Sequence, residues 1–169
     1  IMSPKSTDGD ILFRDGLVTS GSYSLTKVYG IKHPMDRVAV TANGNLQRIV
    51  SSYYDAPVQV TVKHSNQVRG TPGVWDRCVH LSVFDQVFCK ADSTVHVYNA
   101  EWRSLVESGK IGLGQLFRFQ NVLPEFILHS AGPTSNGGFW RNYTLECSSM
   151  TCLIHEEFCP NIWELSRDT

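Results

Sequence analysis

The sequence predicts an α+β domain in which helices pack around an antiparallel β-sheet. Three observations support this class. Several segments alternate apolar and polar residues with the period of two that marks a strand with one solvent-facing side. Shorter segments repeat apolar residues every three or four positions, as in a helix with one buried face. Most of the expected strands follow one another through turns, with helices interspersed irregularly, and this order favours antiparallel pairing.

The first part of the chain is predicted to be an N-terminal arm ahead of one domain. Residues 1–35 are rich in Gly, Ser, Asp and Lys and hold only short apolar pieces. Residues 36–169 are expected to form the single domain, within the ~100–200 residues that are usual for one. Its first predicted helix is capped by Asn45, runs to about Tyr54 and stops at residues 55–57. The apolar positions on one face of this helix are Leu46, Ile49, Val50 and Tyr53.

Strands and two further helices account for the rest of the domain. The valines of residues 58–62 alternate with polar residues, which predicts a strand with one wet face. The other expected strands are residues 74–83, 84–91 (as a turn or a further strand), 93–98, 139–147 and 152–158. Short helices are expected at residues 99–108 and from the Gly-Leu-Gly sequence of residues 112–114 onward.

Composition and net charge indicate which classes of binding partner the protein is expected to have. The 169 residues are 41% hydrophobic and 18% charged, and 15 basic residues against 16 acidic ones give a net charge of −1. This balance argues against a protein that binds nucleic acid non-specifically or lies on an anionic membrane. No apolar run approaches the ~20 residues of a membrane span. We therefore expect a cytoplasmic protein, a monomer or homodimer, whose partner is a small molecule rather than nucleic acid or membrane.

The cysteines show no spacing typical of a structural zinc site, so no metal is expected. They are Cys78, Cys89, Cys147, Cys152 and Cys159. Cys147 and Cys152 flank an expected hairpin turn at residues 148–151, and two alternatives stay open for them. Either they face each other across the hairpin, or they are free buried thiols in a reducing cytosol, which is the favoured alternative.

Two charged residues lie on strand faces that are otherwise apolar. Arg77 shares its face with Trp75, Val79, Leu81 and Val83, so alternation directs its guanidinium group inward. Glu156 shares its face with Cys152, Ile154 and Phe158. Burying either charge without a partner costs several kcal/mol.

Two interpretations of this pair are open. In one, Arg77 and Glu156 form a buried ion pair with each other. In the other, they flank a cavity in which Arg77 binds a ligand carboxylate and Glu156 meets a hydroxyl or takes part in proton transfer. The glycine-flanked helix start at Gly112–Leu113 adds free amides that suit an anion.

The second interpretation agrees with a resemblance to a known family. The chain resembles the chorismate–pyruvate lyases and their relatives. The resemblance runs in order over roughly residues 36–160 and is carried by four motifs. A W-x-R motif corresponds to residues 75–77, and a motif of the form G-K-x-x-L-G-x-x-F corresponds to residues 109–117. A G-x-W followed by a basic residue corresponds to residues 138–141, and the closing L-x-x-E-x-F-x-P to residues 153–160.

The resemblance implies a fold and a reaction. Members of this family enclose the ligand in an internal cavity of an antiparallel sheet, beneath two helical flaps, and release pyruvate from chorismate to leave 4-hydroxybenzoate without metal or organic cofactor. Arg77 and Glu156 are then the catalytic residues, one at the ligand carboxylate and the other at the ring hydroxyl and the bond that breaks. The expected substrate-binding residues are Leu46, Gly112, Leu113, Trp75, Trp140 and Arg141.

Departures from the family pattern keep alternatives open. The spacing between Trp140 and Glu156 is shorter than in the family, and Arg141 is followed by Asn142 rather than by a second basic residue. A cavity reshaped in this way suits a cyclase or isomerase of secondary metabolism that acts on another carboxylated ring. A non-catalytic domain that binds a small molecule is the third alternative, because the same fold also serves as a sensor.

Overall fold

Seven strands and five helices form the part of the chain that the computed structural model describes, residues 13–14, 25–108 and 112–167. The strands are β1 (Phe13–Arg14), β2 (Gln59–Gln67), β3 (Val74–Val83), β4 (Gln86–Val97), β5 (Glu125–Pro133), β6 (Phe139–Cys147) and β7 (Met150–Phe158). The helices are α1 (Leu25–Tyr29), α2 (Pro34–Val40), α3 (Leu46–Tyr54), α4 (Ala100–Glu107) and α5 (Leu113–Phe119).

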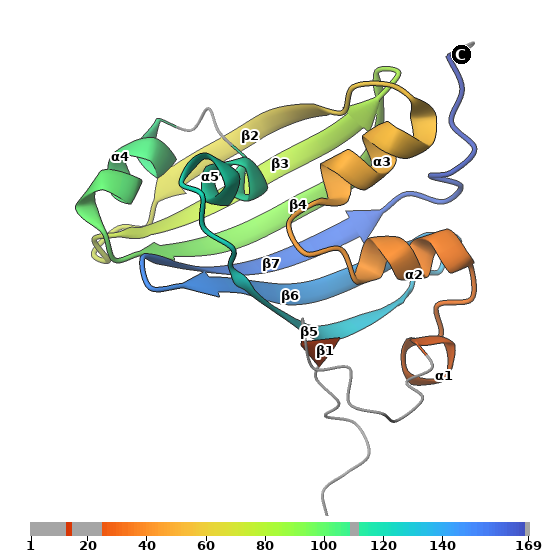
Figure 1. The fold of residues 1–169 in the computed structure, drawn as a ribbon, viewed down its shortest axis with the longest axis horizontal. Coiled ribbons are helices and arrows are strands. Elements are labelled where there is room, and N and C mark those ends of the chain that lie inside the picture. Colours follow the sequence, from red (N-terminus) through yellow and green to blue (C-terminus); the bar gives the residue numbers. More distant parts are fainter. Residues whose placement is uncertain (1–12, 15–24, 109–111, 168–169) are drawn as a thin grey trace, which may run out of the picture.

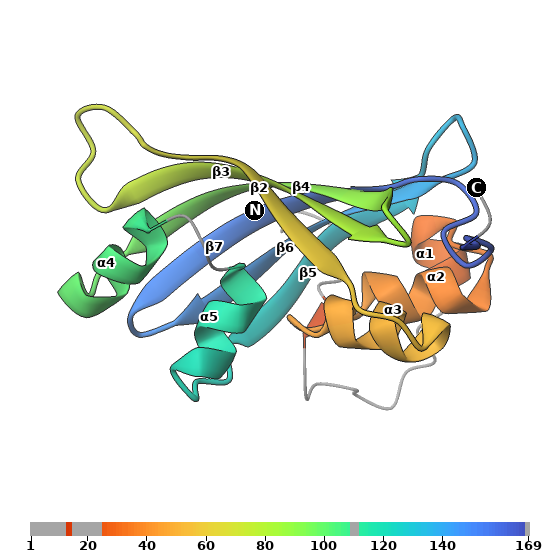
Figure 2. The ribbon, with the colours of Figure 1, turned by 90° about the horizontal axis from the view of Figure 1, so that it is seen from above.

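The strands make one antiparallel sheet in the order β1-β5-β6-β7-β4-β3-β2. Figure 1 shows this sheet running under α3 and α5, and Figure 2 shows that α3, α4 and α5 all lie on the same side of it. On the other face of the sheet, none of the helices that the structure describes is found. The predicted α+β class with an antiparallel sheet is therefore confirmed.

Several predicted elements match the structure closely. The expected strands at residues 74–83 and 139–147 are β3 and β6, and the expected helix from Asn45 to Tyr54 is α3. Helix α3 ends where Asp55 adopts a left-handed conformation, with φ of 48°. Asn99 caps α4 by accepting hydrogen bonds from the amides of Glu101 and Trp102.

The strands of the structure differ from the expected ones in two places. Residues 84 and 85 form a turn, as one of the expected alternatives had it, and residues 86–97 form the single strand β4 where two strands were expected. Asp92 lies exposed on the outer face and does not interrupt the ladder. Strand β5 was not predicted, since its residues 126–128 are all buried and show no alternation. Within the first 35 residues the structure has β1, which pairs with β5, helix α1 and the first turn of α2.

The hydrophobic core fills the space between the sheet and the helices. Leu46 and Val50 of α3 are buried there, together with Phe88, Val95 and Leu145 of the strands. Alternation along β3 and β7 holds as predicted, since Arg77 is 2% exposed and Glu156 is 5% exposed on their inner faces. All five cysteines carry free thiols, and Leu145 rather than Cys147 stands opposite Cys152.

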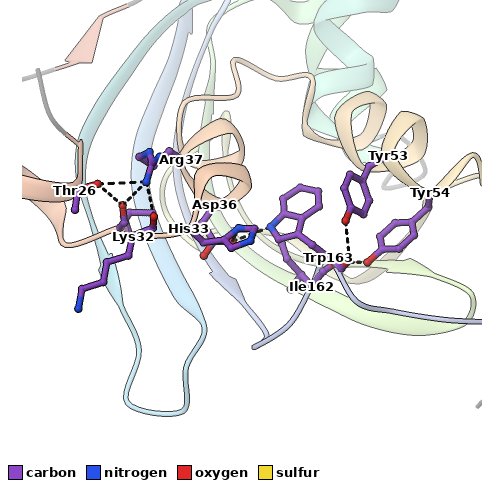
Figure 3. A network of polar contacts seen from close by, with 10 residues as sticks. Thr26, Lys32, His33, Asp36, Arg37, Tyr53, Tyr54, Ile162 and Trp163 are labelled. Atoms are coloured by element: carbon purple, nitrogen blue, oxygen red, sulfur yellow. Dashed lines mark hydrogen bonds and ion pairs between the residues drawn. The ribbon is translucent and has the colours of Figure 1, made fainter. Parts of the chain in front are cut away.

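The segment that follows β7 links α3 to α2 through hydrogen bonds. Tyr53 and Tyr54, at the end of α3, donate hydrogen bonds from their hydroxyl groups to the carbonyls of Trp163 and Ile162, at 2.9 and 2.6 Å. The Trp163 indole N–H donates to Asp36 of α2 at 2.8 Å, and Figure 3 shows the three contacts together. Helix α3 is thereby held at its C-terminal end, while its N-terminal end reaches the middle of the sheet (Figure 1).

Candidate functional site

A cavity of about 70 Å³ is lined by the inner face of the sheet and by residues at the starts of α3 and α5. Its apolar walls include Val60, Val79, Leu81, Ala91, Leu145 and Ile154. Its polar lining includes Gln47, Arg77, Ser93, Arg141, Tyr143 and Glu156. Among the described residues, the buried charged side chains are Arg77, Arg141 and Glu156, and all three line this cavity.

Strand register places Arg77 and Glu156 on either side of β4. Arg77 of β3 stands opposite Ser93 of β4, and Ser93 stands opposite Ile154 of β7, two residues before Glu156. Neighbouring strands lie about 4.8 Å apart and a strand rises about 3.3 Å per residue, so the Cα atoms of Arg77 and Glu156 are separated by roughly 12 Å. Between them β4 presents the small residues Ser93 and Ala91, which leave open space above the sheet.

Glu156 is held by two donors from β6. Its Oε2 accepts a hydrogen bond from Arg141 Nε at 2.7 Å, and its Oε1 accepts one from the Tyr143 hydroxyl at 2.8 Å. The guanidinium group that pairs with Glu156 is thus that of Arg141, and not that of Arg77 as one interpretation of the sequence expected. Arg77 and Glu156 remain as two separate charged groups of the same cavity.

Arg141 is fully buried and makes three kinds of contact at once. Besides its ion pair with Glu156, its Nη1 donates to the carbonyls of Val40 and Ala42 at 3.0 and 2.8 Å. Its guanidinium carbon lies 4.1 Å from the centre of the Tyr143 ring. Burial by itself lowers the pKa of Arg141, but the Glu156 carboxylate outweighs this effect and the pKa is raised. Arg141 therefore stays protonated.

Burial also changes the proton affinity of two neighbours. It raises the pKa of the Tyr143 hydroxyl well above its usual value, and the Glu156 carboxylate raises it further. Tyr143 is consequently a neutral donor. Burial lowers the pKa of Arg77, because a charged guanidinium group loses water there. An anion beside Arg77 would offset that loss.

The starts of two helices complete the lining. Leu46 at the start of α3 and Gly112 and Leu113 at the start of α5 all line the cavity. The loop before α3 contacts α5 backbone to backbone: a Cβ atom added at Gly114 would lie 2.8 Å from the Gly44 carbonyl oxygen. Only glycine permits so close an approach.

Two predicted binding residues are not brought to the cavity. Trp75 is buried on β3, opposite Val95, and is not part of the lining. Trp140 alternates with Phe139 and Arg141 along β6, so it lies on the outer face of the sheet, where its ring is 6.2 Å from that of His155. Trp75 and Trp140, which were expected to bind substrate, therefore do not line this cavity.

Sequence reasoning missed Tyr143, Ser93 and Gln47. Alternation could have predicted that Tyr143 points into the cavity, because it lies two residues after Arg141 on the same face of β6. Ser93 was not singled out, because the sequence analysis expected two separate strands where the structure has the single strand β4. Gln47 carries no local signal, since a polar residue in the first turn of a helix is common.

The described residues show neither a metal-binding cluster nor a membrane-spanning helix. In the ranges 13–14, 25–108 and 112–167, no group of three or more His, Cys, Asp or Glu side chains is arranged to hold a metal ion. Within that part of the chain, no helix has the length and the apolar run that a membrane crossing requires. Comparison of the sequence with models of protein families and with curated proteins finds no match.

Proposed function

We propose that this protein is a cofactor-free lyase that acts on chorismate or a related carboxylated cyclic metabolite, releasing pyruvate and leaving a hydroxybenzoate. The observation that carries the proposal is that all three buried charged side chains of the described chain line one cavity with otherwise apolar walls. Two guanidinium groups and one carboxylate give this lining a net positive charge, which favours an anionic ligand.

Arg77 supplies the anchor for the ligand carboxylate. Its planar guanidinium group presents paired N–H donors that match the two oxygens of a carboxylate. Because Arg77 is 2% exposed, such a contact forms away from bulk water, where electrostatic attraction is screened little. The small residues Ser93 and Ala91 beside it leave room for a ring to extend toward Glu156.

Glu156 supplies a fixed negative charge at the far end of the ring. Arg141 and Tyr143 each use one lone pair of its oxygens, and a second lone pair on each oxygen is left for a ring hydroxyl. Held in this way, the carboxylate needs no reorganisation when charge develops at the breaking bond. Positioning and fixed charge suffice for this reaction, because loss of enolpyruvate makes the ring aromatic.

Helices α3 and α5 correspond in this proposal to the two flaps that cover the ligand. The amides at the starts of these helices, near Leu46 and Leu113, line the cavity together with apolar side chains. The ordered motifs of residues 36–160 support the same assignment.

Pyruvate release tests the proposal directly. Wild-type protein is mixed with chorismate, and pyruvate is followed through lactate dehydrogenase and NADH oxidation, while liquid chromatography follows 4-hydroxybenzoate. We expect the two products in equal amounts, and their formation should be lost in Glu156→Gln. The matched control is Glu157→Gln, which changes an exposed carboxylate next in the chain. Pyruvate release no faster than the uncatalysed reaction at saturating chorismate rejects the proposal.

Binding without turnover is the second candidate function. It is favoured by the two hydrogen bonds that Glu156 already accepts, since Arg141 and Tyr143 hold both oxygens of the carboxylate in place. Isothermal titration calorimetry with 4-hydroxybenzoate distinguishes this function from the lyase. Tight binding together with no pyruvate release identifies a small-molecule-binding domain, or an enzyme such as a cyclase or isomerase with a different ring substrate.

A further inference from the structure

We propose that Arg141 is a positioning residue that couples the orientation of Glu156 to the segment between α2 and α3, taken as residues 40–45 and so including the last residue of α2. The inference rests on the proposed function of the cavity for its kinetic consequence, but its structural part is independent of the substrate. It changes the role expected for Arg141 from contact with the ligand to control of the residue that contacts it.

The contacts of Arg141 point in two directions. On one side its Nε holds Glu156 Oε2 at 2.7 Å. On the other side its Nη1 holds the Val40 and Ala42 carbonyls, which belong to residues about one hundred positions earlier in the chain. The guanidinium group is rigid and planar, so a shift of either side is transmitted to the other.

The surroundings of Arg141 leave it little freedom. The residue has no exposed surface, and its guanidinium group lies against the ring of Tyr143, whose hydroxyl holds the other oxygen of Glu156. Tyr143 and Arg141 therefore fix both oxygens of the carboxylate from one strand. Of these two, Arg141 alone is also bonded to the segment between α2 and α3.

That segment reaches the helices that line the cavity. It leads from Ala42 into Gly44, whose carbonyl lies against Gly114 of α5, and then into α3. When α3 and α5 sit against the sheet, the Val40 and Ala42 carbonyls hold Arg141, and Arg141 holds Glu156 toward the cavity. Displacement of the segment withdraws two of the three acceptors of Arg141 and releases Glu156 from its fixed orientation.

The test compares Arg141→Lys with Arg103→Lys. A lysine keeps the positive charge, but its single nitrogen replaces the two nitrogens, Nε and Nη1, by which Arg141 bonds Glu156 on one side and the two carbonyls on the other. Arg103 is the matched control, because its Nε also donates to a backbone carbonyl, that of Val97, outside the cavity. Hydrogen exchange measured by mass spectrometry follows the amides of Thr41 and Ala42, which are hydrogen-bonded in the native chain. Pyruvate release from chorismate gives kcat and KM.

In Arg141→Lys we expect exchange at Thr41 and Ala42 at least tenfold faster, and kcat at least tenfold lower with KM within about threefold of wild type. Arg103→Lys should change neither. A third variant, Tyr143→Phe, should lower kcat without faster exchange, because it frees Glu156 but leaves Arg141 bonded to the segment.

Unchanged exchange at Thr41 and Ala42 in a folded Arg141→Lys overturns the coupling, whatever the substrate is. Absence of pyruvate release in the wild type overturns the proposed function, and the exchange measurement still decides the coupling. If Arg141→Lys does not fold, Gly114→Ala replaces it, since its added methyl group pushes on the Gly44 carbonyl. An unchanged kcat in Gly114→Ala then overturns the proposal.

Discussion

Replacement of Arg77 by alanine removes the proposed carboxylate anchor and leaves the rest of the cavity in place. Arg77 is 2% exposed and faces the cavity from the middle of β3, so no surface residue can substitute for it. Alanine loses both the charge and the paired donors. Lysine keeps the charge but loses the planar fork, so Arg77→Lys should lie between Arg77→Ala and the parent.

The size of the effect follows from the hydrogen bonds that are lost. Charge-assisted hydrogen bonds contribute roughly 1.5–3 kcal/mol each. A carboxylate that takes two donors from Arg77, and after the substitution is solvated only by water that enters the enlarged cavity, should lose about 3 kcal/mol. Since 1.4 kcal/mol corresponds to a factor of ten, the affinity should fall by about a hundredfold or more in Arg77→Ala, and about tenfold in Arg77→Lys.

The measurement is the dissociation constant of 4-hydroxybenzoate by calorimetry, together with kcat/KM for pyruvate release. Circular dichroism and a thermal melt first establish that each variant folds. Arg103→Ala, an exposed arginine of α4 outside the cavity lining, is the control for loss of a positive charge. If folded Arg77→Ala binds and turns over ligand like the parent, Arg77 is no anion anchor and the site is assigned wrongly.

Four further predictions concern the other side of the cavity. Glu156→Gln should lower kcat by at least tenfold with little change in 4-hydroxybenzoate affinity, measured as for Arg77, because it removes charge from the reacting end and not from the anchor. Arg141→Ala should lower the free energy of unfolding by about 3–5 kcal/mol in urea titration, because it leaves Glu156 as an unpaired buried charge. Ala91→Leu should abolish ligand binding in calorimetry by filling the space between the anchor and the carboxylate, at a stability loss of about 1–3 kcal/mol from overpacking. The pKa of Tyr143 is raised on folding, so its contribution to stability is complete below its unfolded value near pH 10 and is lost as the pH rises toward the folded value; Tyr143→Phe should reduce this alkaline loss in pH-dependent melts.

Each of these four predictions would be contradicted by a specific result. Equal losses of affinity and kcat in Glu156→Gln would make Glu156 a binding residue. A stability change below about 1 kcal/mol in Arg141→Ala would contradict the buried ion pair. Undiminished binding in folded Ala91→Leu would place the ligand elsewhere, and identical alkaline melts for Tyr143→Phe and the parent would show that the hydroxyl does not stay protonated beside Glu156.

The inward direction of the two predicted charges was available from the sequence alone. Alternation is a local property of an extended chain, because successive side chains point to opposite faces whatever the strand pairs with. Neighbours on β3 and β7 therefore sufficed to turn Arg77 and Glu156 toward the core. The same rule, applied to β6, would have added Tyr143 to the site and directed Trp140 away from it. The start of α3 was also predicted from local sequence, since the Asn-Gly-Asn sequence of residues 43–45 precedes Leu46, although the Asn45 side chain makes no capping hydrogen bond.

The partner of Glu156 was decided by tertiary structure. Register sets Arg141 directly opposite Glu156 across the β6–β7 pair, while Arg77 is one strand further away beyond β4. The Val40 and Ala42 carbonyls that complete the bonding of Arg141 come from about one hundred residues earlier in the chain. Because they are backbone groups, no side-chain pattern in the sequence indicates that they bond Arg141. Sequence patterns report which face a residue occupies. The identity of the group opposite depends on how strands pair and helices dock, and those are settled by the packing of the whole core.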